Sequence, residues 1–155
     1  MLDFNWQDYQ SQLSIFINVV IATILVAIIG LERETRHKPA GLRTNMIIGG
    51  ATCLFVSLTG PLIDFLEKTQ NPELLRIDPI RVLEAIVVGI SFIGAGTILK
   101  SKEEHKVMNL TTAATLLISG CIGIAVALQQ YYLAIGITAL LFTINRILNR
   151  WTYNK

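Results

Sequence analysis

The chain has 155 residues, of which 52% are hydrophobic and 15% charged, and its mean hydropathy is +0.55. Soluble domains carry roughly 25% charged residues, so this composition argues against an ordinary water-soluble fold and indicates a protein that resides in lipid. The net charge of +2 is small, and the basic residues form no stripe with interleaved aromatic side chains. A nucleic-acid partner is therefore not expected.

Five apolar stretches have about the length needed to cross the hydrocarbon layer of a membrane, which is about 20 residues with a range of roughly 17–25. Backbone groups in lipid must find hydrogen-bond partners within the chain, and the alternating pattern of a β-barrel is absent, so we expect helices. The predicted fold class is an all-α, polytopic membrane bundle of about five helices, formed by a single domain over residues 1–155. The stretches cover residues 13–31, 44–60, 82–99, 110–128 and 131–148.

The boundaries of these stretches follow from turn-forming and polar residues. Pro61 is expected to close the second stretch, and only Gln129 and Gln130 separate the last two, which predicts a tight hairpin. If that boundary were absent, the chain would have four helices and the C-terminus would lie on the other side. The first stretch follows Asp3 and Asp8 with no Lys or Arg before it and no cleavage site after it, so we expect the mature protein to retain it.

The distribution of Lys and Arg predicts the orientation of the bundle. Lys68, Arg76 and Arg81 lie on one side, whereas the rest of the 13 basic residues fall in the first loop, the third loop and the C-terminal tail. Because cytoplasmic loops carry the excess of Lys and Arg, we expect the N-terminus outside and the C-terminus in the cytoplasm.

Small residues are concentrated in the third and fourth stretches. In lipid, small side chains allow two helix backbones to approach closely, so these stretches are predicted to form a tight helix pair. A cleft lined by exposed backbone is the alternative. The residues are Gly89, Ser91, Gly94, Ala95 and Gly96 in the third stretch and Ala113, Ala114, Ser119, Gly120 and Gly123 in the fourth.

Four helix ends meet at the predicted cytoplasmic face, where a candidate functional cluster can form. Charges of both signs surround a Pro-Ala-Gly turn in the first loop, although a basic loop that contacts anionic lipid headgroups would explain them as well. Thr111 or Thr112 can cap the fourth helix, whose free N–H groups favour an anion. The candidate residues are Glu32, Glu34, Arg43, Gly94, Gly96, Thr111 and Thr112.

Two acids near the predicted outer face form a second candidate site. Glu84 is the one acid inside an apolar stretch, and intramembrane acids are often functional, but Glu84 can also reach water or pair with Arg81 one turn earlier. Asp78 precedes Pro79 and can cap the third helix. Asp78 and Glu84 together offer part of a hard-cation site, since Mg²⁺ accepts carboxylates and water.

Several of these segments together resemble the MgtC/SapB family of bacterial inner-membrane proteins. The motifs occur in the same order across roughly residues 30–125, and such a series is more specific than any single motif. They are Gly-Leu-Glu-Arg-Glu (30–34), Lys-Pro-Ala-Gly-Leu-Arg-Thr (38–44), Asp-Pro-Ile-Arg (78–81), Gly-Ile-Ser-Phe-Ile-Gly-Ala-Gly (89–96) and Leu-Thr-Thr-Ala-Ala-Thr (110–115).

The resemblance implies a multi-pass protein of the bacterial plasma membrane that is linked to magnesium homeostasis and to survival under low magnesium or acid stress. No motif requires a cofactor, and Mg²⁺ is the ion that the resemblance implies. The chain departs from the family pattern at Asn45, where His is frequent, at Leu117, where Trp is common, and at Glu84, where the residue is usually small and apolar. The cytoplasmic C-terminal domain of many relatives is not expected here.

Three functions follow from these observations. The first is a non-enzymatic membrane regulator that acts through helix contacts with other membrane proteins or with copies of itself. The second is an oligomeric magnesium or cation transporter or channel that uses Asp78, Glu84 and the cytoplasmic cluster. The third, an intramembrane enzyme, is the weakest, because His37 and His105 are loop residues without partners at ligand spacing. The lipid bilayer is an expected partner in each case.

Overall fold

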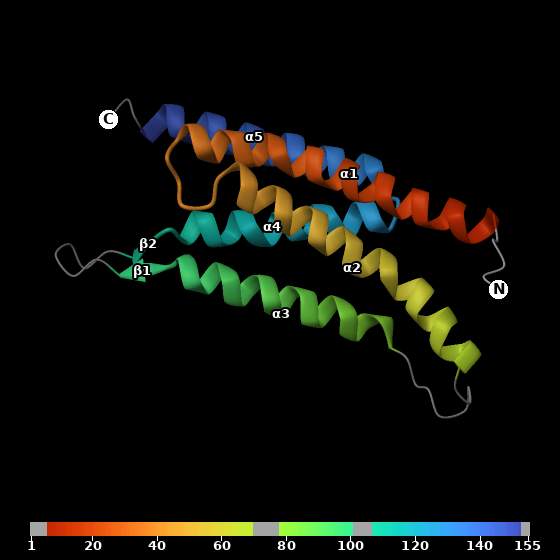
Figure 1. The fold of residues 1–155 in the computed structure, drawn as a ribbon. Coiled ribbons are helices and arrows are strands. Elements are labelled where there is room, and N and C mark those ends of the chain that lie inside the picture. Colours follow the sequence, from red (N-terminus) through yellow and green to blue (C-terminus); the bar gives the residue numbers. More distant parts are fainter. Residues whose placement is uncertain (1–5, 70–77, 101–106, 153–155) are drawn as a thin grey trace.

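The computed structural model describes residues 6–69, 78–100 and 107–152, which form five helices and one short hairpin (Figure 1). This confirms the predicted all-α bundle. Arg76 and His105 lie outside the described residues. The strands β1 (Leu99–Lys100) and β2 (Val107–Met108) pair antiparallel between the third and fourth helices. The helices are α1 (Trp6–Thr35), α2 (Leu42–Thr69), α3 (Pro79–Thr97), α4 (Leu110–Ala127) and α5 (Tyr131–Thr152).

Three observations refine the predicted boundaries. Pro61 does not end α2, which continues to Thr69 because Leu62, Phe65 and Leu66 maintain a helical apolar spacing after it. The chain turns between α4 and α5 at Gln129, whose φ of 59° is left-handed, so the two are separate helices as predicted. The short hairpin between α3 and α4 was not predicted from the sequence.

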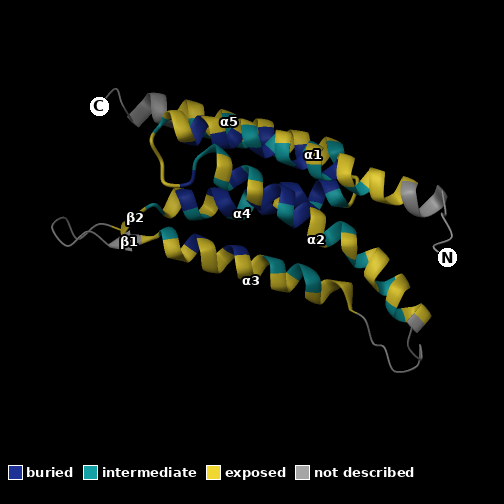
Figure 2. Ribbon diagram, in the orientation of Figure 1, coloured by how far each residue is buried: buried dark blue, intermediate teal, exposed yellow. Residues whose placement is uncertain are grey.

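Helix α4 lies at the centre of the bundle and contacts each of the other four helices. Its buried residues recur every three or four positions, which is the spacing of one helical face, and include Thr112, Leu116, Ser119 and Val126. Figure 2 shows the buried residues gathered where α4 meets its neighbours. In Figure 1, α5 runs beside α1, and the two helices are in contact.

Glycines bring α1, α2 and α4 unusually close together. A methyl group on Gly49 of α2 would lie 2.7 Å from Val26 of α1, and one on Gly50 would lie 2.7 Å from the hydroxyl of Thr23. A methyl group on Gly123 of α4 would clash with the carbonyl oxygen of Gly49. The middle of the three-helix contact is therefore closed by backbone and small side chains.

The predicted pairing of α3 with α4 is confirmed at two points. Gly94 lies against Ala113, and Ile90 packs so closely on Gly120 that a methyl group there would clash with it. A methyl group added at Gly89 or Gly96 of α3 would meet open space. These two glycines therefore do not contribute to the contact between α3 and α4. Helix α3 is consequently the least enclosed of the four long apolar helices, with only Ile90 and Gly94 buried.

The outer surface of the bundle is strongly apolar, as expected for a protein in lipid. Large side chains such as Phe16, Phe55 and Phe92 are more than half exposed. Exposed apolar surface on this scale is not tolerated by a monomer in water. Helices α1 to α4 each contain a stretch long and apolar enough to cross a membrane, whereas the part of α5 whose side chains are described, Tyr131–Ile147, is apolar but shorter.

Candidate functional site

One end of the bundle, here called the Arg33 end, contains most of the buried polar contacts between helices. It is the end at which α1 and α3 finish and α2 and α4 begin, on the left in Figure 1. Arg33 reaches the interior because it continues the buried face of α1 that runs through Val26 and Ile29. These positions follow the spacing of one helical face, so the register that buries the apolar residues also buries the arginine.

Arg33 joins the end of α1 to the start of α4. It is 3% exposed, and its Nη2 donates a 2.8 Å hydrogen bond to the hydroxyl oxygen of Thr112, which is fully buried. The Nε of Arg33 is buried and has no hydrogen-bond partner. The carbonyl oxygen of Arg33 accepts from the backbone N–H of Lys38 at 3.1 Å, which stabilises the turn after α1.

Glu32 lies beside Arg33 but its carboxylate is engaged elsewhere. It forms an ion pair with Arg36 one turn later, and its Oε2 accepts a 3.2 Å hydrogen bond from the side-chain amide of Asn145. Asn145 belongs to α5, so Glu32 links α1 to α5. The buried carboxylate therefore has a cationic partner and a hydrogen-bond donor, as a buried charge requires.

Asn45 connects α2, α4 and the loop between α1 and α2. Its Nδ2 donates to the carbonyl oxygens of Ala40 at 3.1 Å and Gly41 at 2.8 Å, and its Oδ1 accepts from the hydroxyl of Ser119 at 2.7 Å. Asn45 and Ser119 are fully buried. The amide thus satisfies the carbonyl of Ala40, which would otherwise be costly to bury, and adds a second bond to that of Gly41, which also accepts the backbone N–H of Asn45 at 3.2 Å.

Glu34 stabilises the same loop from its exposed side. Its Oε2 accepts the backbone N–H of Leu42 at 2.8 Å, the first residue of α2, and so acts as a cap for that helix. The side chain also covers Gly41, where a methyl group would lie 3.0 Å from Oε2. Glu34 therefore has a structural role that accounts for its position.

The structure brings together only part of the predicted cytoplasmic cluster. Glu32, Gly94 and Thr112 are buried at the Arg33 end, and Glu34, in the last turn of α1, contacts the loop that follows. Arg43, Gly96 and Thr111 are exposed and take no part in the buried contacts described above.

Neither Thr111 nor Thr112 caps α4, contrary to the prediction. The cap is Asn109, two residues before Thr111, with a left-handed φ of 67°, and it forms no side-chain hydrogen bond to its own helix. Its Nδ2 instead donates to the carbonyl oxygen of Thr97 at 3.1 Å, which satisfies the end of α3. The two threonines lie inside the first turn because the helix starts at Leu110.

The two acids of the second candidate site, Asp78 and Glu84, lie at the opposite end of α3, and both are exposed. Asp78 is the N-cap of α3, as predicted, and its carboxylate accepts the N–H of Ile80 at 3.0 Å. Glu84 is exposed, as is Arg81, and no ion pair between them is present in the described residues. The described residues also contain no group of three or more His, Cys, Asp or Glu side chains that could hold a metal ion.

Sequence reasoning missed four residues of the Arg33 end, and helical periodicity could have found three of them. Arg33, Asn45 and Ser119 each lie on the buried face of their helix, at the spacing set by neighbouring apolar residues. A polar residue on such a face needs a partner, which marks it for attention. The fourth, Asn145, depends on the contact between α5 and α1, which sequence spacing does not reveal.

Comparison with known proteins gives a consistent result. A model of the MgtC family matches residues 19–153. The chain is 33% identical over 139 residues to the putative magnesium transporter YhiD of Escherichia coli K12, which covers 88% of this chain and 61% of that protein. It is 35% identical over 132 residues to the protein MgtC of Salmonella typhimurium LT2, with 85% of this chain and 51% of that protein covered.

An uncharacterized protein of Haemophilus influenzae is 34% identical over 146 residues, with 92% of this chain and 60% of that protein covered. The chain therefore spans about half to three-fifths of the length of these curated relatives. No solved structure matches the chain.

Proposed function

The chain belongs to the MgtC family, and from this premise we propose that it is a multi-pass protein of the bacterial inner membrane that serves magnesium homeostasis or stress survival as a non-enzymatic regulator. It acts through helix contacts with other membrane proteins or with copies of itself. The N-terminus lies outside and the C-terminus in the cytoplasm, so the Arg33 end faces the cytoplasm. The excess of Lys and Arg at that end supports this orientation.

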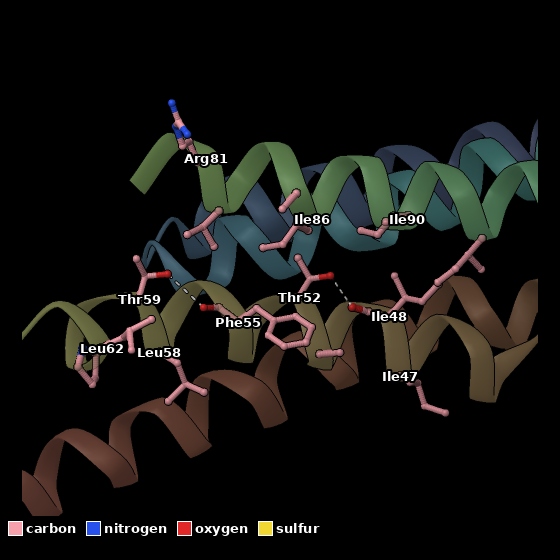
Figure 3. A pocket seen from close by; sticks show the side chains of 16 residues that line it. Ile47, Ile48, Thr52, Phe55, Leu58, Thr59, Leu62, Arg81, Ile86 and Ile90 are labelled. Carbon is pink, nitrogen blue, oxygen red and sulfur yellow. Dashed lines mark hydrogen bonds between the residues drawn. The ribbon is translucent and has the colours of Figure 1, made fainter. Parts of the chain in front are cut away.

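The observation that carries this proposal is an apolar groove of about 1000 Å³ between α2 and α3. Figure 3 shows side chains from the two helices facing each other across it. Its two labelled threonines do not require a polar ligand, because Thr52 donates to the carbonyl oxygen of Ile48 at 2.7 Å and Thr59 to that of Phe55 at 3.2 Å. The groove therefore offers apolar packing surface, which is what a helix of another membrane protein can use.

The close packing of α1, α2 and α4 also favours regulation over transport by one chain. Val26, Gly49 and Gly123 fill the space among these helices and leave no room for an ion to pass there. An ion path would have to avoid this contact, and a path between copies of the chain does so. The relative named as a putative magnesium transporter supports this alternative, an oligomeric magnesium or cation transporter or channel.

Magnesium flux into liposomes separates the two functions. Purified chain is reconstituted with a magnesium-sensitive dye inside the vesicles, and entry is followed under an imposed gradient. We expect no flux above that of empty vesicles. If flux occurs, Glu84→Gln should reduce it, since Glu84 is the acid within the apolar part of α3. Flux that is absent at every gradient removes the transporter alternative.

Filling the groove tests the regulator. Ala85 lines the groove and is exposed, so Ala85→Trp should fill part of it and impair growth in low magnesium of a strain that depends on this chain. Leu140→Trp is the matched control, because Leu140 is 59% exposed on α5, outside the groove. Protein levels in the membrane are measured for both variants. Normal growth of the Ala85→Trp strain would contradict a role for the groove.

A further inference from the structure

Arg33 carries a buried positive charge that forms no ion pair within the described residues, although Glu32 lies close enough to attract it electrostatically. Its Nη2 bonds only the neutral hydroxyl of Thr112, and its Nε has no partner. Glu32 is taken up by Arg36 and Asn145, and the ion pair with Arg36 is the only one within the described residues. Glu32 is thus the one acid shared by two cations, Arg33 and Arg36, which leaves one positive charge in excess. A buried charge that is not balanced is strongly unfavourable, so the position of Arg33 indicates an anionic partner.

The first turn of α4 adds a second positive feature at the same place. Because Asn109 turns its amide toward Thr97, it leaves its own helix without a side-chain cap. The first backbone bond of this turn runs from Ala113 to Asn109, so the N–H groups of residues 110–112 have no acceptor among the described residues. Such groups, together with the helix dipole, give a helix N-terminus a partial positive charge.

Two positive groups therefore meet at one point, since Thr112 holds the guanidinium of Arg33 against the N-terminal turn of α4. We propose that an oxyanion of the phosphate type binds there, held by Arg33 and by the free N–H groups of this turn. A guanidinium and a helix N-terminus are the two protein groups best suited to phosphate oxygens. The inference rests on this geometry and does not depend on the regulatory role proposed above.

The first turn of α4 is accessible from the end of the bundle. Leu110 and Thr111 are exposed, so an oxyanion can approach the first turn of α4 from outside, although Thr112 and Arg33 lie inside. In a membrane-spanning bundle this end lies at the level of the lipid headgroups. The phosphate can therefore belong to an anionic phospholipid or can be free in solution, and both sources offer the same oxygens to the same donors.

The first experiment measures the melting temperature of the purified full chain in detergent with increasing inorganic phosphate, against chloride at equal ionic strength. A ligand that binds the folded state raises the melting temperature. We expect a rise for the wild-type chain and an apparent phosphate affinity at least ten times weaker for Arg33→Gln. Arg43→Gln is the matched control, because Arg43 is an exposed basic residue at the same end and should leave the response unchanged.

The second experiment identifies the source of the phosphate. Native mass spectrometry compares retention of phosphatidylglycerol and phosphatidylcholine by the wild-type chain and by Arg33→Gln. Selective retention of phosphatidylglycerol that Arg33→Gln loses assigns a lipid headgroup, whereas a response to inorganic phosphate alone assigns the free ion. Either result supports the site.

Thr112 provides a milder test in case Arg33→Gln does not fold. Thr112→Val removes the hydroxyl that positions the guanidinium and nearly keeps the volume, so it should weaken binding several-fold, while Thr112→Ser should retain it. The proposal is overturned if the wild-type chain responds to neither phosphate nor phosphatidylglycerol. It is also overturned if Arg33→Gln or Thr112→Val responds as fully as the wild-type chain.

Discussion

Asn45 illustrates how one polar side chain within a buried helical face can hold several elements of this bundle in place. Its amide bonds two loop carbonyls and the hydroxyl of Ser119; the contacts with Ala40 and Ser119 are buried, and the contact with Gly41 is partly buried. Water cannot readily replace the two buried bonds when they are broken, although hydrogen bonds in lipid average only about 0.6 kcal/mol each. The effect of Asn45 should therefore come from its three bonds acting together.

We expect Asn45→Ala to lower the free energy of unfolding by about 2 kcal/mol and Ser119→Ala by about 1 kcal/mol, on the scale of hydrogen bonds within membranes. The two changes should not add, because both remove the same bond. Reversible unfolding in mixed micelles measures each variant and the double variant. Asn45→His should retain more stability than Asn45→Ala, since an imidazole can donate and accept. Strict additivity would contradict the shared bond.

The residue-level prediction from sequence succeeded where chemistry was local and failed where it depended on packing. Asp78 was predicted as the cap of α3 because an acid before a proline is a local signal, and the structure confirms it. Thr111 and Thr112 were predicted as caps on the same kind of signal, but Asn109 took that place by pairing with the end of α3. Arg33 was placed among the charges of the first loop and in the motif of residues 30–34, but its buried bond was not predicted, because its partner lies 79 positions away.

At the scale of whole elements, α3 is held to the bundle chiefly by Ile90 and Gly94 against α4. We expect Ile90→Ala to lower the free energy of unfolding by about 2 kcal/mol, at the low end for buried Ile, because lipid can fill part of the space. Phe92→Ala should cost less than about 0.5 kcal/mol, since Phe92 is 82% exposed on the same helix. Unfolding in mixed micelles measures both, and equal costs would contradict this account.

Element positions were largely predictable because hydrophobic length and turn residues are local properties of the sequence. The tight turn at Gln129 and the starts of α4 and α5 agree with the predicted stretches. The prediction that Pro61 ends α2 was wrong, because the helix continues through it. An apolar helix can accommodate a proline when the flanking residues continue the helical spacing. The groove between α2 and α3 was not predictable, because it depends on how far α3 separates from α2.

For the molecule as a whole, helix order explains why the Arg33 end can become a site at all. Antiparallel neighbours place the end of α1 beside the starts of α2 and α4. The sequence therefore predicted the meeting of these ends correctly. The sequence could not predict which side chains meet, because that depends on the rotation of each helix about its axis. This rotation is fixed only when buried helix faces, such as those of Ile29 and Leu116, pack together.

The orientation proposed for the whole bundle rests on its basic residues and can be tested by labelling. We expect Gln130→Cys, placed in a chain whose two native cysteines are replaced by alanine, to react with an impermeant maleimide in intact cells. Arg43→Cys should react only after the cells are opened, because Arg43 lies at the end that carries most of the Lys and Arg. The reverse pattern of labelling would contradict the proposed orientation.

A fluorescent protein that matures only in the cytoplasm, fused after Lys155, decides whether α5 crosses the membrane. Helix α5 has 22 residues, which at about 1.5 Å per residue is enough for a hydrocarbon layer of roughly 30 Å. We therefore expect fluorescence together with external labelling of Gln130→Cys. External labelling without fluorescence, at normal levels of the fusion, would instead mean that α5 returns along the outer surface. In that case Asn145 would lie on the outer side and could not reach Glu32 at the cytoplasmic end. That outcome would contradict the hydrogen bond between the two side chains.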